Sequence, residues 1–181
     1  VPLQGILYKP EGFDASQEYP MMVYFYERNS DVLHSYTVPA AGSSSINRSS
    51  YVSRGYLLFV PDIPYAIGYP GESALDAVVP GVLGLIAEGF VDRTKIGVQG
   101  HSWGGYQIAY MLTRTDLFAA AEAGAGALPA KLNHKELDKP GFASMMQSYF
   151  GCQSTQQLAL CGQIFDTFDA VSYTPPPLPT T

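Results

Sequence analysis

The chain has 181 residues, of which 46% are hydrophobic and 14% charged, and its formal net charge is −6. Its length fits a single globular domain, and its 13 tyrosines and 9 phenylalanines exclude a disordered chain, which would lack such aromatic residues. With 16 acidic against 10 basic residues, we expect no nucleic-acid partner, and no apolar run long enough for a membrane span stands out.

Residues 1–20 lack a basic start followed by an apolar stretch, so they predict no compartment and the localisation stays open. The two cysteines, Cys152 and Cys161, lack the paired spacing of a zinc site. The sequence therefore predicts no metal site.

The first third of the chain predicts three short strands: Gly5–Tyr8, Met21–Tyr26 and Tyr56–Val60. The second of these is apolar and aromatic without polar alternation, which is typical of strands in a sheet covered on both faces. A hydroxyl-rich loop, Ala40–Ser50, leads toward a helix expected to end near Gly55.

Helices and strands alternate in the next part of the chain. Ser73–Gly89 predicts a helix that starts with a capping-box-like Ser73-x-x-Asp76 and contains Pro80, which either kinks the helix or sits in its first turn. We then expect a strand at Ile96–Gln99, a helix at Tyr106–Arg114 and a buried strand at Ala119–Ala125. This alternation predicts an α/β fold, a mostly parallel sheet with helices on both faces.

Residues 128–181 differ in character and end in the proline-rich Thr174–Thr181, which cannot form a central strand. We therefore predict two parts, residues 1–127 and a divergent C-terminal segment of uncertain structure over residues 128–181.

One motif carries chemistry. Gly100-His101-Ser102-Trp103-Gly104 fits G-x-S-x-G, the nucleophile elbow, and lies between a predicted strand and a predicted helix as that elbow requires. The flanking glycines let strand and helix approach closely, while the strained turn presents the serine hydroxyl and the first helical N–H groups face the site. Ser102 is therefore the candidate nucleophile.

Three segments, KIGVQGHSWGGYQIAYMLTR, YLLFVPDI and VYFYERNSDVLHSY, together resemble the α/β-hydrolase catalytic domain of the prolyl oligopeptidase family of serine peptidases. The resemblance runs from about Leu3 to about Ala125, so residues 1–127 correspond to the N-terminal half of that domain. It implies an oxyanion hole made by the Tyr26 hydroxyl, with Tyr24 as the alternative, and by the Trp103 backbone N–H. Most members have glycines directly after this tyrosine, whereas this chain has Glu27-Arg28.

In α/β-hydrolases the acid and the base follow the serine in the order Ser…Asp…His. No aspartate or histidine after Ser102 matches the family's positions. His134 lies in a charged stretch typical of a surface histidine, and Asp166 and Asp169 are followed by no histidine. The interpretation is a truncated catalytic domain whose C-terminal strands are incomplete.

Other polar and aromatic residues leave two interpretations open. Asp62 closes a strand at the edge where α/β ligands bind, and it either orients the site or forms an Asx turn. Trp103 and Tyr106 either form an apolar wall for a substrate or pack the helix. We expect His34 to have a structural polar role, and His101 to pack or orient rather than act as a base.

The resemblance implies a serine peptidase that hydrolyses peptide bonds through an acyl-enzyme and needs no cofactor. Two alternatives remain open at this point: an α/β-hydrolase esterase, and a non-catalytic fragment that lacks the triad aspartate and histidine. An exposed sheet edge, where later strands would pair, could support oligomerisation.

Overall fold

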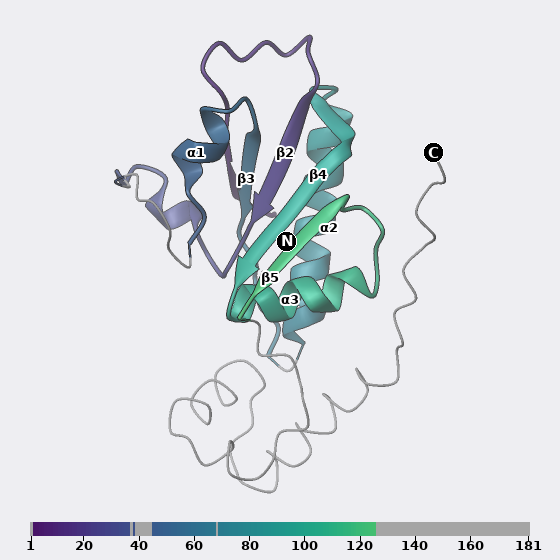
Figure 1. Cartoon of the computed structure of the whole chain (residues 1–181). Helices are drawn as coiled ribbons and strands as arrows, with labels where there is room; N and C mark the ends of the chain where they lie inside the picture. The colour runs from purple at the N-terminus through teal and green to yellow at the C-terminus, as the bar shows by residue number, and fades with distance from the viewer. Residues whose placement is uncertain (1, 37, 39–44, 68, 126–181) are drawn as a thin grey trace, which may run out of the picture. The chain divides into compact units, whose positions relative to one another are not determined.

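The computed structural model describes residues 2–36, 38, 45–67 and 69–125. These residues form an α/β-hydrolase-like fold around one five-stranded sheet (Figure 1). The strand order is β1-β3-β2-β4-β5, with β1 antiparallel to β3 and the remaining pairs parallel. The mostly parallel sheet confirms the α/β fold predicted from the alternation of strands and helices. Cys152, Cys161, the candidates His134, Asp166 and Asp169, and the segment 128–181 all lie outside the described residues.

The strands lie where the sequence predicted them, with shifted ends. Their bounds are β1 Gly5–Tyr8, β2 Tyr19–Tyr24, β3 Leu57–Pro61, β4 Val91–His101 and β5 Ala120–Gly124. The fourth strand is much longer than Ile96–Gln99, because its start pairs with the start of β2, where Tyr19 is opposite Val91. The register of the β2–β4 pair shifts once, between Tyr19 and Met21, after which Met21 is opposite Ile96.

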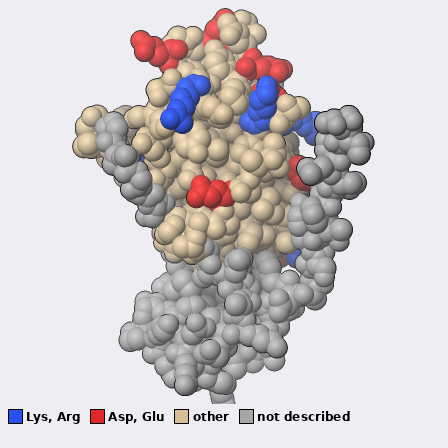
Figure 2. Space-filling model, viewed as in Figure 1, with Lys and Arg blue, Asp and Glu red and all other residues tan. Residues whose placement is uncertain are grey.

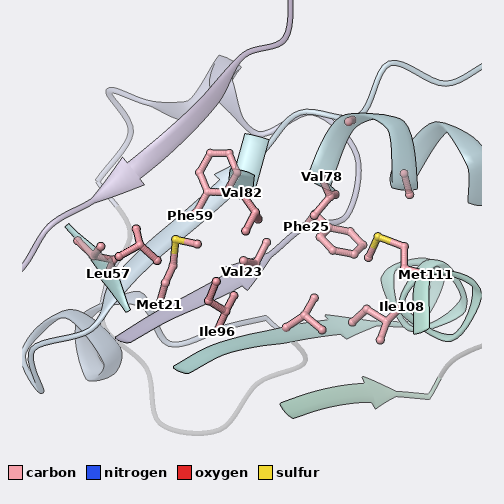
Figure 3. Close-up of a cluster of buried hydrophobic side chains, with 14 of the residues drawn as sticks. Met21, Val23, Phe25, Leu57, Phe59, Val78, Val82, Ile96, Ile108 and Met111 are labelled. Carbon is pink, nitrogen blue, oxygen red and sulfur yellow. The ribbon is translucent and has the colours of Figure 1, made fainter. Parts of the chain in front are cut away.

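Helices cover both faces of the sheet. Helix α1 (Arg48–Val52) packs on one face, over a small cluster that includes Tyr24 and Leu58. Helices α2 (Pro70–Ala87) and α3 (Trp103–Leu112) pack on the other face, over the main core. In this core Phe25 lies beside Val78 of α2 and Met111 of α3 (Figure 3). Because successive strand residues point to opposite faces, the neighbours Tyr24 and Phe25 belong to different clusters.

The start of α2 differs from the prediction. The helix begins at Pro70, with Tyr69 as its N-cap, so Ser73 lies inside the first turn and forms no capping box with Asp76. The Ser73 hydroxyl instead donates to the Tyr69 carbonyl at 2.7 Å and accepts from the Ala66 N–H at 3.0 Å. Proline is well suited to a first helical position because it needs no N–H acceptor there, and this favours the earlier start. The second proline, Pro80, lies inside the helix.

Strand β5 was expected to be buried, and this expectation is wrong for the described part of the chain. Four of its five residues, from Ala120 to Ala123, are exposed, because β5 lies at the edge of the described sheet and pairs only with β4 there. Oligomerisation through this edge stays a prediction. Figure 2 shows that most of the charged side chains visible in this view lie toward one end of the described surface, although an acidic patch also lies near its middle.

Among the described residues, α2 is long and apolar enough to cross a membrane by length and composition alone. The helix presents one side to the main core, where Ala74, Ala77, Val78 and Val82 are buried. A core helix passes the same test, so this property is weak evidence for a membrane span.

Candidate active site

Ser102 occupies a strained turn between β4 and α3. Its backbone has φ 54° and ψ −110°, and it is the N-cap residue of the helix. A positive φ is uncommon for a residue with a Cβ, and such strain is concentrated at functional sites. The turn is held from both sides, since the Ser102 N–H donates to the Gly124 carbonyl at 2.8 Å and its own carbonyl accepts from Tyr106 at 3.1 Å. This is the strand–turn–helix context that the G-x-S-x-G motif predicted.

The glycines around Ser102 allow close backbone packing. A Cβ on Gly100 would lie 2.8 Å from the carbonyl carbon of Gly104. A Cβ on Gly104 would lie 2.7 Å from the carbonyl oxygen of Phe25, at the end of β2. Since real Cβ atoms do not approach backbone atoms so closely, both positions require glycine while this packing is kept. The elbow helix is therefore pressed against the end of the neighbouring strand.

Trp103 and Tyr106 pack inside the domain. Their rings stack with centroids 5.0 Å apart, and each residue is only 3% exposed. Of the two interpretations left open by the sequence, this burial favours packing over an exposed apolar wall. Trp103 is also the first residue of α3, so its backbone N–H belongs to the first helical turn, whose N–H groups face outward from the helix start.

Tyr26 lies two residues beyond the end of β2, and its side chain is 40% exposed. The alternative, Tyr24, is 7% exposed and belongs to the cluster beneath α1. The difference in exposure favours Tyr26 as the residue that could meet a substrate. Its role in an oxyanion hole stays a prediction, as do the roles of Ser102 and Trp103.

Two residues not identified from the sequence hold the backbone of Tyr26. The Tyr65 hydroxyl donates to the Tyr26 carbonyl oxygen at 2.7 Å. The same hydroxyl accepts from Nε2 of Gln107, a fully buried residue of α3. Burial raises the pKa of Tyr65 well above its ordinary value, and the hydrogen bond from Gln107 only partly offsets this effect. Gln107 could have been noticed in the sequence only as a polar residue on the apolar face of the predicted helix.

Asp62 ties the loop after β3 to the loop after β2. Its carboxylate accepts from the backbone N–H groups of Asn29, at 2.6 Å, and Ser30, at 2.9 Å, and from the Ser30 hydroxyl. Desolvation acts to raise the pKa of Asp62, but the hydrogen bonds from Ser30 and Asn29 outweigh it and hold the pKa below 3.8. Of the two interpretations left open, this long-range contact favours an orienting role over a local Asx turn.

The two described histidines both precede Ser102 in the chain. His34 is exposed. His101 is the last residue of β4, and a Cβ added to Gly124 would lie 3.4 Å from the Nδ1 atom of His101. Within residues 2–125, leaving out the undescribed gaps, no three His, Cys, Asp or Glu side chains gather in a way that could hold a metal ion.

Known proteins that resemble this chain are peptidases. The model of the prolyl oligopeptidase family matches residues 67–157, half of the chain, and continues past Ala125, where we expected the resemblance to end. Dipeptidyl peptidase 8 of Mus musculus is 27% identical over 136 residues, which cover 68% of this chain and 15% of that protein. "Probable glutamyl endopeptidase, chloroplastic" of Arabidopsis thaliana is 30% identical over 145 residues, which cover 70% of this chain and 15% of that protein. The chain thus spans about 15% of the length of these curated relatives.

Solved structures of peptidases also resemble this chain. Porphyromonas gingivalis dipeptidyl peptidase 4 matches with a TM-score of 0.56 and 25% identity, over 70% of this chain and 19% of that one. A Mycobacterium tuberculosis puromycin-hydrolyzing peptidase matches with a TM-score of 0.50 and 20% identity, over 66% of this chain and 20% of that one, and supports the fold alone. With half of its length matched by the family model, and with an elbow serine on a mostly parallel sheet, this chain belongs to the prolyl oligopeptidase family, whose members are serine peptidases of the α/β-hydrolase fold.

Proposed function

We propose that this chain carries the nucleophile and the oxyanion hole of a serine peptidase that cleaves peptide bonds through an acyl-enzyme. The observation that carries the proposal is the backbone of Ser102, at φ 54° and ψ −110° between a central strand and the helix that follows it. A strained turn of this kind presents a side chain above the sheet edge, where parallel α/β sheets bind their ligands.

In the proposed reaction, the Ser102 oxygen bonds to the carbonyl carbon of the substrate while its proton passes to a general base. The carbonyl oxygen becomes an oxyanion, which accepts hydrogen bonds from the Trp103 N–H and the Tyr26 hydroxyl. When the carbon–nitrogen bond breaks, the amine leaves with the proton from the base. A water molecule then attacks the ester, restoring the serine hydroxyl and releasing the acid.

Activity of this chain alone requires a general base from outside the described residues, and His134 is the one histidine of the sequence that follows Ser102. The proposal that the chain acts alone therefore departs from the sequence-based interpretation of a truncated domain, in which His134 is a surface histidine. His34 and His101 precede Ser102, whereas the base of an α/β-hydrolase follows its nucleophile. A serine hydroxyl without a base is a weak nucleophile at neutral pH, so the base decides whether this chain is active alone. Family membership supports peptides as the substrate class, and the resemblance suggests cleavage after proline or another small residue.

The test is hydrolysis of Ala-Pro-p-nitroanilide and of p-nitrophenyl acetate by the full chain, by Ser102→Ala and by Ser53→Ala. Ser53 is an exposed serine just after α1 and serves as the matched control. We expect anilide cleavage by the wild type and by Ser53→Ala, and none by Ser102→Ala. Ester turnover without anilide cleavage would replace the peptidase with an esterase. No turnover of either substrate by folded protein would overturn the proposal for this chain.

A further inference from the structure

The loop after β2 and the loop after β3 are joined along their length. We call residues 26–30 the Tyr26 loop and residues 62–65 the Tyr65 loop. The Ile63 N–H donates to the Glu27 carbonyl at 3.1 Å, between the Asp62 contacts at one end of the Tyr26 loop and the Tyr65 contact at the other. Since β2 and β3 are parallel neighbours, both loops leave the same edge of the sheet. The Tyr26 loop is therefore held at three places rather than left to its own conformational preference.

The contact at Tyr26 continues into the elbow helix. Gln107 donates from Nε2 to the Tyr65 hydroxyl, and that hydroxyl donates its single proton to the Tyr26 carbonyl at 2.7 Å. Gln107 is fully buried, and the Tyr65 ring lies 6.5 Å from the Trp103 ring between centroids. The direction of both bonds is fixed, because the Tyr26 carbonyl can only accept and the phenol has one proton.

This chain of bonds joins the two elements that carry the proposed oxyanion donors. Gln107 lies four residues after Trp103, about one helical turn along the same face of α3. At the other end, the bond to the Tyr26 carbonyl fixes the peptide unit next to the Cα that carries the Tyr26 side chain. Donors of this kind act only when they are held at the position where the oxyanion forms, so their relative placement affects the rate.

We propose that Tyr65 is a positioning residue, which, through its hydrogen bonds to Gln107 and to the Tyr26 carbonyl, sets the Tyr26 hydroxyl relative to the Trp103 N–H. The proposal rests on the proposed function, because it concerns the oxyanion hole of the same site. It assigns to Tyr65 the restraint of a loop that begins Tyr26-Glu27-Arg28. Tyr65 itself has no direct contact with the reacting atoms in this assignment.

A double-mutant cycle tests this assignment. Tyr65→Phe, Tyr26→Phe and the double variant are compared with wild type for kcat and KM on Ala-Pro-p-nitroanilide. Tyr26→Phe should lower kcat about 100-fold, the usual loss for an oxyanion donor. Tyr65→Phe should lower kcat about tenfold with little change in KM, because the ring and the substrate contacts remain. In the Tyr26→Phe background, Tyr65→Phe should have almost no further effect, since it acts through the missing hydroxyl.

The control is Tyr69→Phe, which removes the hydroxyl of an exposed tyrosine just before α2 and should leave kcat at the wild-type value. Because Trp103 is the only tryptophan in the chain, its fluorescence reports whether each variant keeps the fold at the elbow. An active wild type with an unchanged Tyr65→Phe, or with equal losses in both backgrounds, overturns the positioning role alone. A wild type without Ser102-dependent cleavage overturns the proposed function, and the positioning role with it.

Discussion

Gly104 and Phe25 are 79 residues apart in the chain, yet a Cβ on Gly104 would lie 2.7 Å from the Phe25 carbonyl oxygen. The first turn of α3 thus rests directly on the backbone at the end of β2, one residue before Tyr26. Substitution of Gly104 moves one of these two segments, and both carry groups of the proposed site.

Gly104→Ala should therefore lower the free energy of unfolding by about 1–3 kcal/mol, the usual result of forcing extra atoms into packed structure. Gly84 in α2 is the matched control, because its Cβ would meet no atom within 4 Å. Gly84→Ala should raise stability by about 0.5–1 kcal/mol, the gain for alanine over glycine in a helix. Urea unfolding measures both variants, and equal shifts in the same direction would contradict the close packing at Gly104.

The strain at Ser102 predicts that a residue without a Cβ is more stable at this position. Ser102→Gly should be more stable than Ser102→Ala by about 1 kcal/mol, because glycine adopts φ 54° without a Cβ clash while alanine keeps the strain. Both variants keep the backbone bond to Gly124 and both lack the nucleophile, so neither should cleave substrate. Thermal unfolding of the pair checks the prediction, and equal stabilities would argue against strain at this turn.

Asp62 predicts a pH-dependent contribution to stability. Its pKa in the folded protein is below 3.8, so the folded state binds the proton more weakly than the unfolded chain does. The contribution is therefore fully present above the unfolded value and is lost as the pH falls through the lower, folded value. Asp62→Asn should cost about 2 kcal/mol at pH 7, since it weakens hydrogen bonds to a charged acceptor, and much less at low pH.

The control for Asp62 is Asp92→Asn. The pKa of Asp92 is also lowered, to about 2, but mainly by the hydrogen bond from Lys95, and its hydrogen-bond partners Thr94 and Lys95 lie only two and three residues away in the chain. A local pair whose lysine is exposed contributes little to stability, so Asp92→Asn should cost less at pH 7. Denaturant unfolding at pH 7 and at about pH 3 separates the two variants. An Asp62→Asn protein as stable as wild type at pH 7 would contradict a stabilising role for the hydrogen bonds from Asn29 and Ser30 to Asp62.

The order of strands and helices could be predicted because it follows from local signals. The apolar run at Met21–Tyr26 and the G-x-S-x-G motif placed β2 and the elbow within a few residues of their positions. The start of α2 could not be placed as well, because Pro70 and Ser73 both resemble helix starts and the choice depends on contacts of the Ser73 hydroxyl with the preceding loop.

The long-range contacts of the site could not be predicted from sequence. Tyr65 and Gln107 are 42 residues apart, and no spacing rule connects a loop tyrosine with a helical glutamine. Similarly, the sequence around Asp62 fits a local turn, and its hydrogen bond from Ser30 can be inferred only when β2 and β3 are known to be neighbours. Sequence patterns report the period of each element, whereas these bonds depend on how the elements pair.

The central claim is that Ser102 is an activated nucleophile, and labelling with a fluorophosphonate probe tests it most directly. Such a probe reacts with a serine whose hydroxyl is activated, rather than with any serine. We predict that the wild-type chain is labelled, that the modified peptide contains Ser102, and that Ser102→Ala is not labelled. A folded wild-type protein that stays unlabelled would contradict the claim, because its elbow would then lack a base that activates the serine.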